Sequence, residues 1–200
     1  TQSATSDLEK IRDQIKADTP EPVDFHLGPG GSSTIFPLNT VTSFAWSRQV
    51  GTAPTFDTPS TFLAALHVIP GSIQTLAFGK YRSPDYETAE RVIPAVGTLT
   101  GQPAVQGEND IYFNLFLPAG IKPANGWPVA ILGHGFTDSK QGAPFAVAAM
   151  LANSGIATIA INVVGHGGGP LGALTVNQLD GSSTTFLDGG RGIDQDGNGA

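Results

Sequence analysis

Two short apolar segments joined by an alanine-rich segment constrain the fold of this 200-residue chain most strongly. Residues 128–133 (PVAILG) and 156–165 (IATIAINVVG) are β-prone apolar runs. Between them, residues 142–155 carry Phe145 and Ala149 at helical spacing and end in glycine, the residue that most often closes a helix. A strand, a helix and a second strand in this order predict a right-handed βαβ unit with parallel strands.

Further strands are predicted ahead of this unit. Residues 73–81 (IQTLAFGKY) and 110–120 (DIYFNLFLPAG) are the clearest. In the second segment both alternating faces are apolar or aromatic apart from Asn114, which is typical of a strand well inside a sheet. Near the N-terminus, residues 6–18 have the spacing of an amphipathic helix, with Ser6 as the expected N-terminal cap.

Composition excludes several classes of function. The net charge is −7 and the ten basic residues are scattered, so we expect no nucleic-acid partner. The absence of cysteine excludes disulfides, thiolate catalysis and cysteine-based zinc sites. No apolar run approaches the roughly 20 residues that span a bilayer, so we expect a protein that is not transmembrane. The chain begins at Thr1 without signal-peptide features, as in a mature secreted protein or a trimmed chain; we expect a secreted or cell-surface location.

The turn after the first strand of the βαβ unit carries the strongest chemical signal. His134, Gly135 and Phe136 follow residues 128–133 directly, and ligands of open α/β sheets bind beyond the carboxyl ends of strands. Gly135 permits a tight turn, and the backbone N–H groups of such a turn can be directed at an anion. Ester hydrolysis needs such donors for the oxyanion of its tetrahedral intermediate. The same residues also fit an ordinary strand–helix turn.

Together these segments resemble a known family. PVAILGHGF, a helix and GIATIAINVVGHGGGP look like the first half of an α/β-hydrolase, in which a His-Gly-x oxyanion turn is followed by a Gly-His-Gly loop. The segments DIYFNLFLPAG, HGFTDSKQGAPFAVA and GGRGIDQDGNG are similar to bacterial extracellular lipases and esterases of the virulence-factor type. The resemblance covers about residues 76–200. It implies that the N–H of Phe136 is an oxyanion donor and that His134 and Gly135 shape the turn.

The nucleophile expected from this resemblance is missing. The superfamily carries it in Gly-x-Ser-x-Gly, which occurs nowhere in this chain, and His166 precedes the place where it would stand. Ser139 begins a helix and is better suited, with Asp138, to capping than to catalysis. We therefore expect the Ser-Asp/Glu-His triad in a C-terminal remainder beyond Ala200, as a separate chain or cleaved fragment that completes the enzyme.

Two groups of residues are candidate metal ligands. His134 and His166 would end neighbouring strands, but two histidines without a third ligand make a poor zinc site. Asp194, Asp196 and Asn198 in DQDGNG stand at positions 1, 3 and 5 of a calcium loop, although the chain ends before position 12. The alternative for this loop is a solvated turn.

The expected fold is therefore α/β: the N-terminal part of an α/β-hydrolase, with a mostly parallel central sheet flanked by helices. Residues 1–69 would form an extension of a short helix, loops and short strands, and residues 70–200 the incomplete hydrolase domain. The expected function is carboxylic ester hydrolysis, as an esterase or lipase acting on an ester or lipid substrate through a serine acyl-enzyme. No organic cofactor is needed. The alternative is a non-catalytic, calcium-stabilised secreted binding module or a degenerate hydrolase.

Overall fold

The computed structural model describes residues 3–50, 55–58, 63–97 and 100–192. The chain divides into two compact units, one formed by Thr1–Val23 with Tyr81–Ile111 and the other by Asp24–Lys80 with Tyr112–Ala200. Strands β4 (Ile73–Asp85) and β5 (Gly107–Pro118) contribute to both units. The boundary between residues 69 and 70 stays a prediction, because this division does not test it.

The smaller unit contains helix α1 (Ser3–Ala17), which confirms the helix predicted from residue 6 onward. Ser6 lies inside the helix, so the capping position predicted for it is wrong. Ile11 is buried, and the Nζ of Lys10 donates a hydrogen bond to the carbonyl of Gly101 at 2.8 Å. Between the ends of β4 and β5, Arg82 and Glu108 form an exposed ion pair at 2.6 Å.

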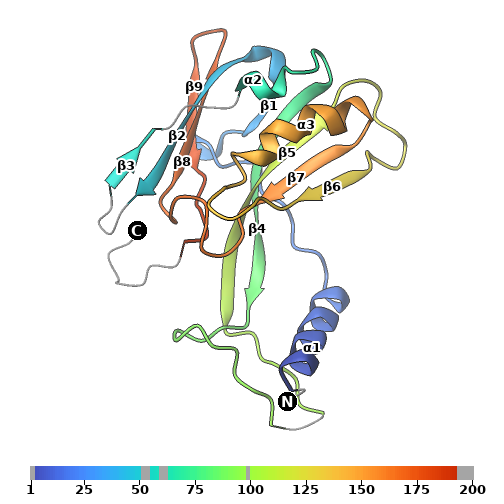
Figure 1. Cartoon of the computed structure of the whole chain (residues 1–200), viewed down its shortest axis with the longest axis vertical. Coiled ribbons are helices and arrows are strands. Elements are labelled where there is room, and N and C mark those ends of the chain that lie inside the picture. Colours follow the sequence, from blue (N-terminus) through green and yellow to red (C-terminus); the bar gives the residue numbers. More distant parts are fainter. Residues whose placement is uncertain (1–2, 51–54, 59–62, 98–99, 193–200) are drawn as a thin grey trace. The chain divides into compact units, whose positions relative to one another are not determined.

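The larger unit contains a five-stranded sheet in the order β1-β4-β5-β7-β6 (Figure 1). Strands β6 and β7 are parallel, and β7 and β5 are antiparallel. The remaining elements of this sheet and its crossover are β1 (Ile35–Pro37), β6 (Val129–Leu132), α3 (Ala143–Asn153) and β7 (Ala157–Ile161).

The predicted strand–helix–strand unit is confirmed as β6-α3-β7. The helix α3 ends just before Gly155, the residue that the sequence predicted would close it. Gly155 has a φ of 70°. Its N–H donates to the carbonyl of Ala152, and the N–H of Ile156 donates to the carbonyl of Leu151. These two bonds form a Schellman motif, which returns the chain directly into β7.

A second sheet of four strands has the order β3-β2-β8-β9 and is antiparallel throughout its described pairs. Its strands are β2 (Val41–Val50), β3 (Thr55–Asp57), β8 (Ala173–Gln178) and β9 (Ser183–Leu187). The other described elements are the short helix α2 (Leu63–Leu66) and the 3-10 turns η1 (Pro29–Gly31) and η2 (Leu38–Thr40).

The predicted fold class is wrong. The structure is 20% helix and 34% strand, with three α-helices among the described residues, and it is not a parallel sheet flanked by helices. Only the β6–β7 pair is parallel among the described pairs. The physical reason lies in the connections. Parallel pairing needs a long crossover, which the chain has between β6 and β7, whereas β8 and β9 are joined by four residues and must run antiparallel.

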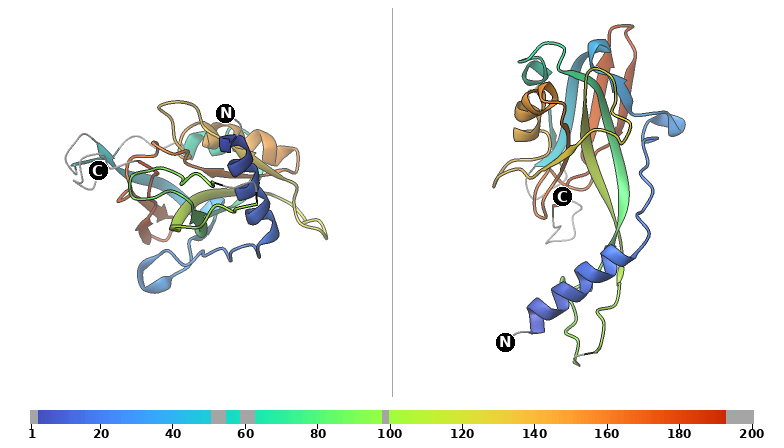
Figure 2. Two further views of the ribbon diagram at one scale, coloured as in Figure 1. Left: turned by 90° about the horizontal axis from the view of Figure 1, so that it is seen from below. Right: turned by 90° about the vertical axis from the view of Figure 1, so that its right-hand side faces the viewer.

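Aromatic side chains join the two sheets of the larger unit. Phe44 of β2 packs edge-to-face on Phe78 of β4 at 6.2 Å between ring centroids, and Phe186 of β9 lies 5.4 Å from Phe78. Phe145 of α3 contacts Phe44 at 5.8 Å and Phe116 of β5 at 4.9 Å. The helix α3 is therefore fixed to both sheets, and α2 lies beside it in both views (Figures 1 and 2).

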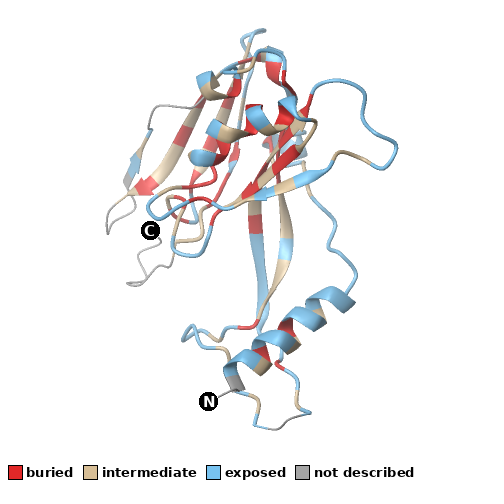
Figure 3. Cartoon of the chain, turned by 45° about the vertical axis from the view of Figure 1, so that its right-hand side comes forward, coloured by how far each residue is buried: buried red, intermediate tan, exposed pale blue. Residues whose placement is uncertain are grey.

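Burial is uneven across the five-stranded sheet (Figure 3). Its inner strands carry buried residues, whereas the edge strand β6 has none, and Ile131 on it is 82% exposed. Among the described residues, every helix is too short or too polar to cross a bilayer.

Replacing Phe145 by alanine removes the side chain shared by both sheets. We expect Phe145→Ala to lower the free energy of unfolding by about 3–5 kcal/mol, measured by urea denaturation followed by circular dichroism. Phe136→Ala is the matched control, because this ring is 88% exposed and its removal should change stability by less than about 0.5 kcal/mol. Equal losses in the two variants would contradict the packing described above.

Candidate functional site

The turn predicted as an oxyanion element follows β6 and precedes α3. Its backbone is unusual at Thr137, whose φ is 63°, a value in the left-handed region that costs a residue with a side chain about 1–3 kcal/mol. Gly135 does not have a positive φ, and a Cβ built on it would meet no atom within 4 Å. The tight point of the turn therefore lies two residues later than the sequence predicted, and the space beside Gly135 is open.

His134 is a structural anchor of this turn. Its Nε2 accepts a hydrogen bond from the N–H of Val163 at 3.1 Å, and its Nδ1 lies 2.9 Å from the carbonyl oxygen of Gly135. An acceptor at Nε2 places the proton on Nδ1, which then donates to Gly135. Both nitrogens of a neutral ring are thus engaged within the protein, and this arrangement does not fit a metal ligand.

Phe136 follows this anchor. Its side chain is exposed, and its ring lies 5.7 Å from that of His166. Among the described residues, no group accepts a hydrogen bond from the N–H of Phe136. This donor is the one that the resemblance assigned to the oxyanion.

The far side of the turn is held by Asp138 and Ser139. The carboxylate of Asp138 accepts the N–H of Ala143, the first residue of α3, at 3.0 Å, although Asp138 lies four residues before Gly142, which occupies the N-cap position. Ser139 is buried, and its Oγ accepts the N–H of Gln141 at 3.3 Å. Ser139 therefore lies in the turn that precedes α3, and the prediction that it begins and caps the helix is wrong, because α3 begins at Ala143 with Gly142 at its N-cap position.

Lys140 is fully buried and paired. Its Nζ lies 2.9 Å from Oδ1 of Asp188, a residue that is itself 1% exposed and directly follows β9. The side-chain amide of Gln141 donates to the other oxygen of Asp188. The positive charge is thus held by a carboxylate and not by the neighbouring Ser139, as expected from the opposite directions of adjacent side chains.

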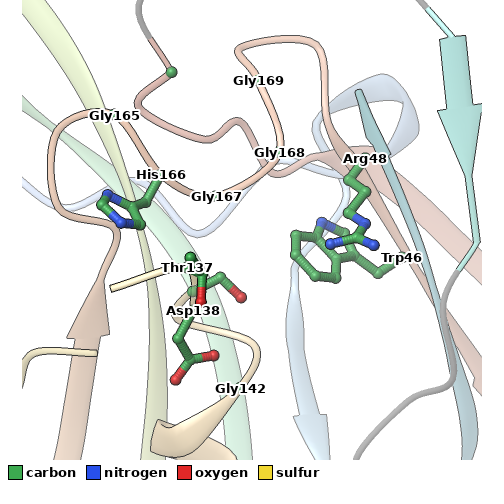
Figure 4. Close-up of a pocket in the computed structure, with 12 residues that line it drawn as sticks. Trp46, Arg48, Thr137, Asp138, Gly142, Gly165, His166, Gly167, Gly168 and Gly169 are labelled. Carbon is green, nitrogen blue, oxygen red and sulfur yellow. The ribbon is translucent and has the colours of Figure 1, made fainter. Parts of the chain in front are cut away.

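A cavity of about 420 Å³ lies beside the turn (Figure 4). Thr137, Asp138 and His166 stand on one side of it, and Trp46 and Arg48 of β2 on the other. Its complete lining is Trp46, Arg48, Thr137, Asp138, Ser139, Gly142, Gly165, His166, Gly167, Gly168, Gly169 and Gly192. The predicted residues His134, Gly135 and Phe136 border it without lining it, and His166 connects them to it, at 5.2 Å from the ring of His134.

Glycine is required in the loop that closes this cavity. Gly167, Gly168 and Gly169 all have φ between 74° and 94°. A Cβ on Gly167 would overlap the side-chain amide of Asn162, and one on Gly168 would overlap Arg48. The run GHGGGP is therefore a loop packed closely against its neighbours.

Arg48 brings no uncompensated charge to the cavity. Its Nε and NH2 bond to the two carboxylate oxygens of Asp57 at 2.9 and 3.0 Å. This hydrogen bond lowers the pKa of Asp57 and raises the pKa of Arg48 from their ordinary values. The guanidinium also lies 5.5 Å from the ring centre of Trp46, so the β2 wall presents an aromatic ring and a neutralised cation.

Sequence reasoning missed Trp46, Arg48 and Asp188, because nothing near them in the chain marks them as part of a site. One signal was present in the sequence: Asn114 interrupts the apolar and aromatic run of residues 111–117, and its amide donates to the carbonyl of Lys140 at 3.0 Å. Asp194, Asp196 and Asn198 lie outside the described residues. Among the residues that are described, no group of three or more His, Asp or Glu could hold a metal ion.

A comparison with models of protein families, with curated proteins and with solved structures found no match for this chain.

The hydrogen bonds of His134 predict its tautomer. At about pH 8, where an ordinary histidine is neutral, we expect His134 to hold its proton on Nδ1 alone. Long-range ¹H–¹⁵N correlation spectra distinguish the two ring nitrogens. His67 is the internal control, because it is exposed and should show averaged tautomers. A proton on Nε2 of His134 would contradict the bond from Val163.

Proposed function

We propose that this chain is the oxyanion-stabilising part of a carboxylic ester hydrolase, an esterase or lipase that works through a serine acyl-enzyme. The serine, acid and histidine of the triad would come from the remainder of the same hydrolase, beyond these 200 residues. The single observation that carries the proposal is the N–H of Phe136, which has no acceptor among the described residues and belongs to a turn anchored on both sides next to a cavity.

The chemistry requires a donor that is already in place. When a serine attacks an ester carbonyl, the carbonyl oxygen gains negative charge, and a fixed N–H stabilises that charge without reorganising. His134 fixes the turn before Phe136, and Asp138 fixes it afterwards, through its N–H on the carbonyl of Gly135 and its carboxylate on the N–H of Ala143. The space where a side chain of residue 135 would stand is open. The likeness of HGFTDSK to bacterial extracellular lipases supports this role through the motif and not through the fold.

The edge strand β6 supports the proposal that another part of the hydrolase is a partner. It has no neighbour on its outer side among the described strands, and Val129 and Ile131 are exposed on it. An open edge with apolar side chains favours pairing with a further strand. We assign this surface to the remainder that carries the triad. The substrate would be an ester or lipid, and the location secreted or at the bacterial cell surface.

Binding of a calcium ion by Asp194, Asp196 and Asn198 stays a proposal. No observation on the described residues favours the alternative of a non-catalytic calcium-stabilised module or a degenerate hydrolase.

The oxyanion role predicts a sharp difference between two substitutions at one residue. In the hydrolase that contains this chain, Phe136→Pro removes the N–H and should lower kcat for p-nitrophenyl esters about 10²–10³-fold. Phe136→Ala keeps the N–H and loses only an exposed ring, so kcat should stay within about threefold. Initial rates, normalised by active-site titration with a fluorophosphonate, measure both.

Two results would reject the proposal. One is equal activity of the proline and alanine variants. The other is robust ester turnover by the 200-residue chain alone, which should be inactive because it lacks the serine.

The exposed edge predicts the solution behaviour of the isolated chain. We expect Ile131→Asp to reduce its aggregation, because a charge on β6 opposes edge pairing. The same change should weaken association with the triad-bearing remainder about tenfold or more, measured by titration calorimetry. Leu179→Asp is the matched control, because Leu179 is also exposed but lies in the β8–β9 hairpin, away from β6. Equal effects of the two changes would remove the special role of β6.

A further inference from the structure

The buried ion pair of Lys140 and Asp188 is costly to maintain. Both side chains are almost completely shielded from solvent, and removing two charges from water costs several kcal/mol per ion before their attraction is counted. Pairs of this kind are often replaceable by apolar residues without loss of stability. The question is therefore what the pair does besides contributing to the fold.

Lys140 joins the turn to three different strands. Its backbone N–H donates to Oδ1 of Asn162, just after β7, at 2.8 Å. Its carbonyl accepts the amide of Asn114 in β5 at 3.0 Å. Its side chain reaches Asp188 after β9. One residue, four positions after Phe136, thus ties the turn to both sheets of the larger unit.

The partner Asp188 is tied in turn to the glycine loop that lines the cavity. Its N–H donates to the carbonyl of Gly172 at 2.8 Å, and the N–H of Gly172 bonds to the carbonyl of Gly169 in the glycine loop. The ion pair therefore connects the turn that carries the Phe136 N–H with the loop that faces it. The energy of a hydrogen-bonded ion pair depends strongly on the distance and direction between its groups, whereas a contact between two apolar side chains allows one to shift along the other.

From this arrangement we infer that Lys140 and Asp188 are positioning residues, which hold the turn at residues 134–139 in register with the glycine loop and so fix the direction of the Phe136 N–H. This inference rests on the proposed function, since the oxyanion is what the N–H would meet. Neither side chain touches the substrate; both act through the turn. The strained φ of Thr137 is consistent with this role, because such a conformation persists only where its surroundings enforce it.

The first experiment measures the turn itself, in the 200-residue chain and without any reaction. The variant combines Lys140→Met with Asp188→Leu, which removes both charges; methionine has a volume close to that of lysine, and leucine is larger than aspartate. We expect hydrogen exchange at the amides of Asp138, Lys140 and Val163, which are bonded within the turn and to its anchors, to become about tenfold faster or more. The amide of Phe78, bonded to Thr34 in the core, should keep its protection.

A control pair tests whether the loss of any ion pair has this effect. Arg82→Met combined with Glu108→Leu removes the exposed pair of β4 and β5 and should leave the three turn amides unchanged. If the Lys140 double variant does not fold, Asp188→Asn removes the negative charge with little change of shape and is compared in the same way. Unchanged exchange at the turn amides in a folded variant would overturn the inference.

The second experiment separates positioning from folding in the hydrolase that contains this chain. Per site titrated with a fluorophosphonate, the Lys140→Met and Asp188→Leu variant should lose about 10²-fold in kcat for p-nitrophenyl acetate with little change in KM. A purely structural role would lower the number of titrated sites and leave kcat per site intact, which would overturn the inference. If the parent protein shows no ester turnover, the proposed function fails, whereas the exchange result still decides whether the pair holds the turn.

Discussion

The packing of Phe145 against both Phe44 and Phe116 is the contact on which the arrangement of the larger unit depends. It places one helix against two sheets whose strands are far apart in the chain. Because α3 is fixed there, its N-terminal end, and the turn that leads into it, must face strand β2. The cavity follows from this geometry: Thr137 comes from the turn and Trp46 from the second sheet, and they meet because an aromatic core holds their supporting elements together. The walls of the cavity and the turn that carries the Phe136 N–H are thus positioned by the same hydrophobic packing.

Local structure could be predicted from the sequence where a few neighbouring residues determine it. Gly155 ends α3 because only glycine readily adopts the left-handed conformation of the Schellman motif, and this signal is complete within five residues. The same holds for the parallel pairing of β6 with β7, which the helical crossover enforces. These elements were predicted with their neighbours because their partners lie close by in the chain.

The fold class and most of the site could not be predicted, because their partners are remote. Strand β2 pairs with β8, which lies more than a hundred residues later in the chain. No local pattern in either strand predicts this pairing. The segment around Asp188 looks like a solvated turn of glycine and aspartate, and only the burial of Lys140, 48 residues earlier, makes that carboxylate an internal counter-ion. The positive φ of Thr137 could likewise not be predicted, because the sequence favours Gly135 as the residue at the tight point of the turn. The helix-flanked parallel sheet was inferred by extending one real βαβ unit to the whole domain.

The polar and apolar features around the turn are those that the proposed assembly with a further part of a hydrolase requires. A strained turn with buried charges behind it is expensive, and chains retain such features where a function depends on them. The interior side of the turn is fully supported by Asn114, Asn162 and Asp188, whereas the adjacent strand β6 leaves Ile131 exposed. A turn that served only to connect a strand to a helix would need neither the buried support behind it nor the exposed apolar edge beside it. Rigid support behind an N–H donor, combined with an open apolar edge beside it, is what a hydrolase would need if a second part brought its nucleophile to this surface.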